Sequence, residues 1–340
     1  MARAPLPSPL LRLTSDEATA LKRRMGAALF NRRIEREDKR ELHFGGRFRW
    51  CPMKYAGPAA RLAFRLAGIY GRAYREFLDI RVREEEFEIP GLAPELDGLT
   101  LLHLSDLHLD IDPALPGAVR AAVERVAGRY DAAVVTGDFN NFTVHSDTLA
   151  LRLVADLRRA FTAPVYGVLG NHDSVRDVPT LERGGVRILL NESVRIRRAG
   201  VSSGPSLLLA GVDDPNIFGT HDLAVALRAR RPGEPCVLLA HAPSVHEDAA
   251  AAGVSLVLCG HVHGGQVCLP SGRTLAWRHW TFPRRVWRGR WTEGATQGYT
   301  TTGVGACGAP LRLNCPPEIV LARLRAAPVP AGTAGATNRQ

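Results

Sequence analysis

Five short polar motifs, each following an apolar run, hold the side chains of this 340-residue sequence that are suited to metal chemistry. Any one of them alone would be ordinary turn chemistry. Five in succession, all rich in carboxylate, amide or imidazole groups, indicate a metal site instead. The candidates are Asp106 and His108 in SDLH, Asp138 in TGDF, Asn171, His172 and Asp173 in GNHD, His241 in AHAP, and His261 and His263 in GHVH.

The donor types favour two cations over one. A mixed set of imidazoles and oxygens suits first-row divalent metals. The seven candidate ligands exceed the four of a structural zinc site and include no thiolate. Two ions about 3.5 to 4 Å apart can stabilise both the attacking and the leaving oxygen of a phosphoryl displacement. Such a pair needs a bridging carboxylate, and Asp138 follows a glycine that gives the backbone room. We expect Gly137, Gly170 and Gly260 to allow sharp turns out of their strands.

The elements that position these residues can be read from residue 99 onward. Strand-length apolar runs alternate with helix-like segments near 115–128, 147–161 and 222–231. Such runs predict an α/β fold in which helices cover the sheet. Ligand sites of these folds lie at the carboxyl ends of the strands, where all five motifs occur.

The motifs SDLHLD, GDFN, GNHD, LAHAP and GHVHGGQ, in this order, resemble the calcineurin-like metallophosphoesterase family. The resemblance covers about residues 99–270, with a weaker likeness at 315–319. It implies a four-layer αββα sandwich of two mixed β-sheets flanked by helices. The activity it implies is hydrolysis of a phosphodiester or pyrophosphate bond by a metal-bridging hydroxide.

The resemblance also implies a role for each site residue. Asp106, His108, Asp138 and His263 would bind the first of two divalent ions (Mn, Fe or Zn). Asp138 would bridge to the second ion, which Asn171, His241 and His261 complete. His172 would face the scissile phosphate, stabilising the transition state or protonating the leaving oxygen, with Asp173 orienting its ring.

Other polar residues near the motifs have ordinary interpretations, with one exception. Asn140 follows the bridging aspartate closely, and we expect it to contact the substrate phosphate. His103 is expected to be packed or hydrogen-bonded inside its strand. Asp213 and Asp214 are expected at a turn or a helix start.

Residues 1–95 are predicted to form a basic helical extension, 96–325 the metallophosphoesterase domain, and 326–340 a disordered tail. The net charge of +10 is concentrated in the extension, since residues 1–83 hold 19 Lys and Arg against 8 Asp and Glu. Residues 57–80 combine Leu, Ile, Tyr and Phe at helical spacing with interleaved arginines. This pattern fits either contact with anionic lipid or a helix packed on the main domain with solvated arginines.

The stretch 273–291 holds four tryptophans among six arginines. Indole and guanidinium groups together favour a phosphate-rich interface, either an anionic membrane or nucleic acid. A folded hairpin with arginine stacked on tryptophan is the alternative. The chain is similar to the membrane-associated branch of the family that resembles UDP-diacylglucosamine pyrophosphatases. We therefore expect a lipid-linked substrate at a membrane surface, with a nucleotide or nucleic-acid phosphodiesterase and a non-catalytic metal-bound scaffold as alternatives.

The remaining composition bears on where the protein works. Six scattered cysteines without a C-x-x-C pair indicate reduced thiols rather than a disulfide framework. We expect neither a secretory signal nor a bilayer-spanning segment. The expected location is the cytoplasm, as a peripheral protein on the inner face of the cytoplasmic membrane.

Overall fold

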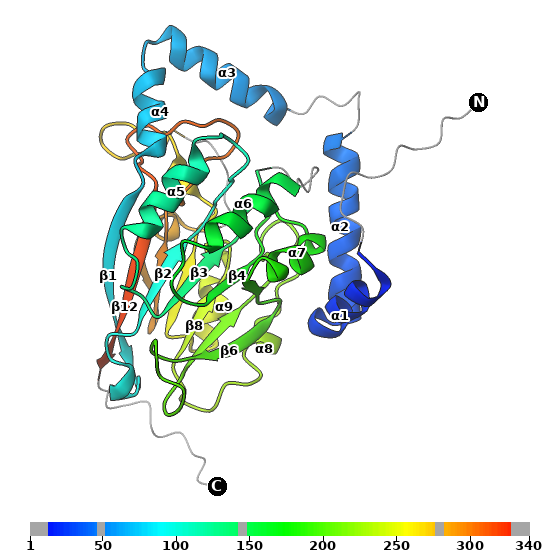
Figure 1. Cartoon of the computed structure of the whole chain (residues 1–340), viewed down its shortest axis with the longest axis vertical. Coiled ribbons are helices and arrows are strands. Elements are labelled where there is room, and N and C mark those ends of the chain that lie inside the picture. Colours follow the sequence, from blue (N-terminus) through cyan, green and yellow to red (C-terminus); the bar gives the residue numbers. More distant parts are fainter. Residues whose placement is uncertain (1–12, 46–51, 142–147, 276–281, 328–340) are drawn as a thin grey trace, which may run out of the picture.

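The computed structural model describes residues 13–45, 52–141, 148–275 and 282–327, which form two β-sheets and the helices around them (Figure 1). The first sheet has the strand order β1-β12-β2-β3-β4-β5. Its strands are β1 (Arg81–Pro90), β2 (Thr100–Leu104), β3 (Ala132–Thr136), β4 (Val165–Val168), β5 (Val186–Ile188) and β12 (Glu318–Ala327).

The second sheet has the order β10-β11-β9-β8-β7-β6. Both sheets are mixed: the first combines parallel pairs with one antiparallel pair, and the second combines them with two. The strands of the second sheet are β6 (Glu192–Ile196), β7 (Leu207–Gly211), β8 (Cys236–Leu239), β9 (Leu256–Cys259), β10 (Gly289–Glu293) and β11 (Thr296–Thr300).

Helices cover the outer face of each sheet. The helices of the described part of the chain, including those of the extension, are α1 (Ser15–Met25), α2 (Ala27–Gly45), α3 (Pro52–Leu66), α4 (Tyr70–Leu78), α5 (Leu115–Glu124), α6 (Thr148–Arg158), α7 (Val178–Arg183), α8 (Leu223–Ala226) and α9 (His246–Ala251). Short 3₁₀ turns occur at Pro94–Leu96, Val175–Asp177, Pro243–Val245, His263–Gly265 and Arg284–Val286. The predicted helices at 115–128 and 147–161 are present. That at 222–231 is only one turn long.

Three apolar cores separate the four layers. The inner core, between the sheets, joins residues of both, such as Leu101 and Val134 of the first with Leu209 and Leu258 of the second. A second core lies between the first sheet and helices α5, α6 and α7, and a third lies between the second sheet and helices α8 and α9. Side chains alternate across a strand, so Leu101 faces the inner core and Leu102 the helices. The predicted four-layer αββα sandwich is confirmed.

The topology brings the polar motifs to one edge. Strands β2, β3 and β4 are parallel neighbours, as are β8 and β9. The residues that follow them therefore emerge at the same ends of their sheets. These are the motifs with Asp106, Asp138, Asn171, His241 and His261.

The ends of the chain meet the sheet differently from the expected boundaries. Strand β1 falls within the range 1–95 expected for the extension, but it pairs in parallel with β12 over its whole length. The part of the extension outside the sheets therefore ends before Arg81. The expected tail, 326–340, begins inside β12, and residues 328–340 lie outside the described part of the chain.

The helices of the extension take up two separate places in Figure 1, with α1 and α2 beside α7 and with α3 and α4 over the end of the first sheet. Helix α1 starts after Thr14, which forms a capping box with Glu17. Its end at Gly26 has φ +82°, which favours glycine. In the described residues, no helix has both the length and the apolar character needed to span a bilayer.

Candidate metal centre

The structure brings all seven predicted ligands together in two overlapping groups. The first ligand group is Asp106, His108, Asp138 and His263. In it, Nε2 of His263 lies 3.3 Å from Oδ1 of Asp106 and 3.3 Å from Nε2 of His108. Nε2 of His108 lies 3.6 Å from Oδ2 of Asp138. These side chains come from the ends of β2, β3 and β9 and are nearly inaccessible to water.

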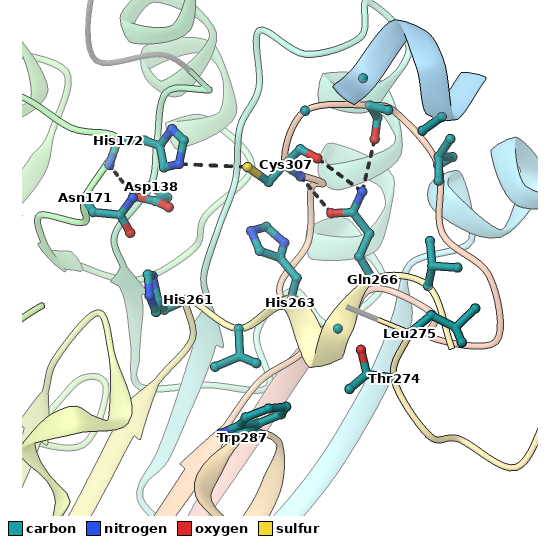
Figure 2. A pocket seen from close by; sticks show the side chains of 18 of the residues that line it. Asp138, Asn171, His172, His261, His263, Gln266, Thr274, Leu275, Trp287 and Cys307 are labelled. Carbon is teal, nitrogen blue, oxygen red and sulfur yellow. Dashed lines mark hydrogen bonds between the residues drawn. The ribbon is translucent and has the colours of Figure 1, made fainter. Parts of the chain in front are cut away.

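The second ligand group is Asp138, Asn171, His241 and His261. Nε2 of His241 is the central atom, 3.3 Å from Oδ2 of Asp138, 3.1 Å from Oδ1 of Asn171 and 3.1 Å from Nδ1 of His261. Asp138 belongs to both groups, which is the position that a bridging carboxylate requires. Figure 2 shows Asp138, Asn171, His261 and His263 on one side of the cavity.

The spacing of these atoms fits divalent cations. Ligand atoms about 2.1 Å from one ion lie about 3.0 to 3.4 Å from each other in octahedral or tetrahedral geometry. The distances within both groups are close to this range. In addition, His108 and His263 face each other through ring nitrogens, an arrangement that a shared cation explains. Buried carboxylates and imidazoles at this density need balancing charge, and metal ligation supplies it.

Each ligating histidine but one has its other ring nitrogen at a main-chain oxygen or a buried cation. Nδ1 of His108 donates to the Asn140 carbonyl at 2.8 Å, and Nδ1 of His241 donates to the Thr136 carbonyl at 2.7 Å. These bonds place the ring proton on Nδ1 and leave the Nε2 lone pair for a metal. His263 has Arg312 beside its Nδ1, at 3.4 Å.

The backbone is forced into unusual conformations at the ligands. Eight non-glycine residues in the described ranges have positive φ, and five of them are predicted ligands. Such conformations cost about 1 to 3 kcal/mol each and persist only where the surroundings enforce them. Their concentration at one place marks a functional site. The five are Asp106, His108, Asp138, His261 and His263.

The ionisation of the site is strongly coupled. Burial alone would raise the pKa of Asp138, but the nearby His241, His172 and His108 hold it well below its ordinary value. Burial likewise opposes the charge on His241, yet the Asp138 carboxylate raises the pKa of that ring to about 10. Burial raises the pKa of Asp106. The bridging position is therefore the most anionic point of the site.

His172 lines the cavity and is half-buried, as expected for a residue that faces the substrate (Figure 2). Its main-chain N–H donates to Oδ1 of Asp138 at 2.8 Å. Its Nδ1 lies 2.6 Å from the Asn141 carbonyl oxygen, and its Nε2 lies 3.9 Å from Sγ of Cys307. The Asn141 carbonyl therefore orients the ring and leaves Nε2 on the cavity side.

Asp173 does not orient the ring of His172, contrary to the prediction. Its carboxylate accepts hydrogen bonds from the main-chain N–H groups of Asp138, Phe139 and Gly170 at 2.7 to 2.8 Å. It is completely buried. Asp173 thus fixes the backbone that carries Asp138 against the backbone that carries Asn171.

Asn140 was expected to contact the substrate, but its side chain does not line the cavity. The amide of Asn140 is 1% exposed and points behind the site, where Nδ2 donates to Oδ2 of Asp177 at 3.1 Å and approaches Asp173. The part of Asn140 that serves the site is its carbonyl oxygen, which holds His108.

Three residues next to the ligands were not predicted from the sequence. The Asn216 amide nitrogen lies 2.8 Å from Nε2 of His261. Arg312 is fully buried and donates to the carbonyls of Thr302 and Gly305 behind His263. Cys307 lies beside His172. None stands in a motif of ligand type, so only the fold could have revealed them.

Other predicted features take structural roles. His103 is buried with Nε2 2.9 Å from Oγ1 of Thr136, and burial lowers its pKa to about 3. Asp214 forms the expected turn by accepting from the N–H groups of Ile217 and Phe218. Asp213 instead binds Thr220 and lies in an ion pair with Arg33.

The Trp- and Arg-rich stretch divides into separate roles. Trp291 is 6% exposed and donates to Oγ1 of Thr300 at 2.9 Å, so it belongs to the core. Trp287 lines the cavity and lies under the Arg284 guanidinium, 5.4 Å from the ring centre. This pair shows arginine stacked on tryptophan, as that alternative expected, but within a 3₁₀ turn rather than a hairpin. Trp277 and Trp280 lie outside the described residues.

Comparison with known proteins agrees with this geometry. The model of the calcineurin-like phosphoesterase family matches residues 99–265. An uncharacterized metallophosphoesterase of Aquifex aeolicus is 30% identical over 277 residues, which cover 76% of this chain and 97% of the relative. The uncharacterized metallophosphoesterase YkoQ of Bacillus subtilis is 28% identical, with coverages of 73% and 92%. The phosphodiesterase YaeI of Escherichia coli is 29% identical, with coverages of 66% and 81%. The chain therefore belongs to the calcineurin-like metallophosphoesterase family and is a metal-dependent phosphoester hydrolase.

Proposed function

We propose that this enzyme hydrolyses a phosphodiester or pyrophosphate bond of a lipid-linked substrate while attached to the surface of an anionic membrane. The observation that carries the proposal is a single cavity with a polar, ligand-bearing side and an apolar side. The name of the YaeI relative, a phosphodiesterase, supports the same bond type.

The cavity has a volume of about 580 Å³, which is more than a phosphate group alone needs. One side presents Asp138, Asn171, His172, His261 and His263 (Figure 2). The other side is mostly apolar, with Gln266 and Thr274 as its polar side chains, and includes three residues of helix α3. A substrate with its phosphate at the ligands and a hydrocarbon chain beside them would match both sides. The apolar side is formed by Gly57, Ala60, Phe64, Val267, Leu275, Ala309 and Leu311.

The outer surface of α3 supports attachment to a membrane. Leu62 and Leu66 are 58% and 80% exposed, and Arg65 beside them is exposed as well. Exposed leucines next to a basic side chain suit the boundary between acyl chains and anionic headgroups. The same helix lines the cavity through Phe64, so a bilayer in contact with α3 would lie near the apolar side of the cavity.

The chain would hold two first-row divalent cations through the two ligand groups, and Mn, Fe and Zn suit this mixture of imidazoles and oxygens. When bound, the cations would polarise the phosphate and lower the pKa of a water molecule. His172, with its Nδ1 proton directed at the Asn141 carbonyl, presents Nε2 to the cavity. In its imidazolium form this atom can protonate the leaving oxygen. The Asp173 carboxylate and the Asn140 carbonyl hold the loops of the site in place by accepting hydrogen bonds from them.

The activity is tested by hydrolysis of bis-p-nitrophenyl phosphate with added Mn²⁺. We expect turnover by the wild type and a fall in kcat of about 10²- to 10⁴-fold in His172→Ala, with two ions still bound per chain. Absence of turnover in both proteins, with metal bound, would favour the non-catalytic scaffold. Comparison of UDP-diacylglucosamine, cyclic nucleotides and single-stranded DNA then identifies the substrate class, and a preference for either nucleotide form would contradict the lipid-linked substrate.

The membrane attachment is tested by flotation with vesicles of phosphatidylglycerol and phosphatidylcholine. Leu62→Ser combined with Leu66→Ser should release the protein from anionic vesicles, because the exposed apolar surface of α3 is lost. Val201→Ser is a matched control, since Val201 is 50% exposed on a loop distant in sequence from α3. Equal flotation of all three proteins would exclude α3 as the contact.

A further inference from the structure

We propose that helix α2 positions the second ligand group, and that Arg33 is the positioning residue. The inference rests on the proposed binuclear centre. Arg33 lies outside residues 99–265, the range that the family model matches. Together with Arg312 it is among the largest of the completely buried side chains in the described residues, and it reaches two loops that carry ligands or their partners. The inference concerns binding of the second cation, and therefore has a readout besides activity.

Arg33 first contacts the loop that carries Asn171. Its Nη2 donates to the Asp173 carbonyl at 2.7 Å and lies 3.5 Å from the Gly170 carbonyl. These carbonyls flank Asn171 and His172 in the chain. The guanidinium thereby fixes the main chain on both sides of a predicted ligand and of the residue that faces the substrate.

Arg33 also contacts the loop beside His261. Its Nη1 lies 3.3 Å from Oδ1 of Asp213, and its guanidinium carbon lies 3.6 Å from the centre of the Phe218 ring. Asn216 lies between Asp213 and Phe218 in the sequence, and its amide nitrogen is 2.8 Å from Nε2 of His261. One planar cation therefore joins the loop of Asn171 to the loop that supports His261.

Glu37, one turn further along α2, extends the same contact. Its carboxylate receives Nε of Arg33 at 2.7 Å, the N–H of Val175 at 2.8 Å and Oγ of Ser174 at 2.6 Å. Nη1 of Arg176 also donates to the Glu37 carboxylate, at 2.8 Å. Glu37 is 1% exposed, so its carboxylate is shielded from water, while Arg176 is itself partly exposed. The segment after His172 is thus anchored to α2 as well as to the loops of its own sheet, which Asp173 contacts.

The arrangement affects the two ligand groups differently. In the first group, His108 is held by the Asn140 carbonyl and His263 by Arg312, both from the main domain. In the second group, the surroundings of Asn171 and His261 share Arg33. A lysine preserves the charge but cannot reproduce a planar fork that serves two loops and stacks on a ring. Substitution of Arg33 should therefore weaken one cation site selectively.

The test uses the full-length, metal-free protein titrated with Mn²⁺ alone, followed by calorimetry and by the electron paramagnetic resonance of free Mn²⁺. We expect two ions in the wild type. In Arg33→Lys, one ion should bind with unchanged affinity and the other about 10- to 100-fold more weakly, as found for residues that support metal ligands. With bis-p-nitrophenyl phosphate at a fixed Mn²⁺ concentration of about ten times the wild-type Kd, kcat should fall by about 2- to 10-fold, the loss in occupancy that this weakening implies, with KM changed much less, and more Mn²⁺ should restore it. Hydrogen exchange should quicken in the peptide covering residues 170–176.

Arg24→Gln is the matched control, because Arg24 anchors the neighbouring helix α1 through Glu182 and Glu192 without touching either loop. It should bind both ions as the wild type does. Arg33→Lys retains the buried charge so that folding is preserved, and circular dichroism verifies it. Unchanged binding of both ions by folded Arg33→Lys, or an equal weakening of both, would overturn the inference. Fewer than two ions in the wild type would instead overturn the binuclear proposal on which it rests.

Discussion

Gly260 shows, at the scale of one residue, how closely the backbone approaches the ligands. The predicted reason for this glycine was a sharp turn, but its φ is not positive. What requires glycine is space, because a Cβ atom there would overlap Oγ of Ser105 and the carboxylate of Asp106. The same holds for Gly170, whose Cβ would overlap the Asp138 carboxylate, whereas Gly137 has both a close approach and φ +88°.

Gly260→Ala should therefore displace Asp106 and weaken Mn²⁺ binding by about 10-fold or more, with a corresponding loss of activity. Gly117→Ala is the control. Gly117 lies in helix α5, has no positive φ and has free space around its Cβ position. An alanine there should stabilise the helix by up to about 1 kcal/mol and leave Mn²⁺ binding unchanged. Wild-type calorimetric titrations for Gly260→Ala would contradict the steric explanation.

Asp177 gives a pH dependence of stability. Burial and the nearby Asp173 carboxylate raise its pKa to about 8, from 3.8 as its ordinary value. The folded protein therefore retains a proton that the unfolded chain releases. The contribution of this group is fully present below pH 4 and is lost as the pH rises towards 8, at about 1.4 kcal/mol per pH unit.

Asp177→Asn mimics the protonated acid and should remove this dependence. Between pH 5 and pH 7, the free energy of unfolding of the wild type should fall relative to that of Asp177→Asn by about 3 kcal/mol. Urea unfolding in the presence of EDTA measures the difference. Asp156→Asn, at an exposed position in helix α6, should show no such trend. If the difference in unfolding free energy between wild type and Asp177→Asn does not change with pH, the Asp177 carboxylate is already charged in the folded protein.

The sequence predicts residue types better than side-chain directions. The sequence could single out the seven predicted ligands, which the structure brings together, because imidazole, amide and carboxylate groups recur at strand ends in one order. Whether Asn140 faces the substrate or lies behind the site depends on the rotation of the chain after β3, and that is decided by the Asp173 carboxylate on the next loop. Local pattern contains no information on such a contact.

At the scale of elements, the strands could be predicted because buried strands of mixed sheets read as continuous apolar runs. The helices of the extension could be predicted from their caps and periodicity, but their docking places could not. Helix α4 packs on the domain through Ala73 and Phe77, while α3 leaves Leu62 and Leu66 exposed. Within the amphipathic pattern at 57–80, the α4 part therefore packs on the domain as one interpretation expected, whereas lipid contact by α3 stays a prediction. Amphipathicity identifies an apolar face but not its partner.

The strand β10 supplies a prediction at this scale, because its tryptophan could have belonged to a membrane surface or to the core. The ring of Trp291 fills the space above Gly298 on the paired strand β11. Trp291→Phe should lose the hydrogen bond to Thr300 and part of the buried area, at a cost of about 1 to 3 kcal/mol in unfolding free energy. Flotation with anionic vesicles should be unchanged. If Trp291→Phe instead loses flotation while keeping wild-type stability, Trp291 contacts the membrane surface.

At the scale of the whole molecule, the metal centre joins the two sheets. The first sheet contributes Asp106, His108, Asp138 and Asn171, and the second contributes His241, His261 and His263. Elsewhere the sheets are held together mainly by the apolar inner core, which is non-directional, and by a few polar contacts such as those of Tyr299 with Glu318 and Gln297 with the Glu88 carbonyl. Bound cations would add directed bonds at the edge where the five motif-bearing strands end, so metal binding and the stability of the sandwich should be coupled.

Addition of Mn²⁺ to EDTA-treated protein should therefore raise the melting temperature in a single cooperative transition. Each site filled at about 100 times its Kd contributes about 2.7 kcal/mol, because the cation binds the folded chain and not the unfolded one. For a domain of this size the shift should be several degrees, measured by calorimetry. Asp138→Asn should lose most of it, since this carboxylate belongs to both ligand groups, whereas Asp156→Asn should retain it. A melting temperature indifferent to Mn²⁺, or two separate transitions of which only one responds, would mean that the cations do not link the two sheets.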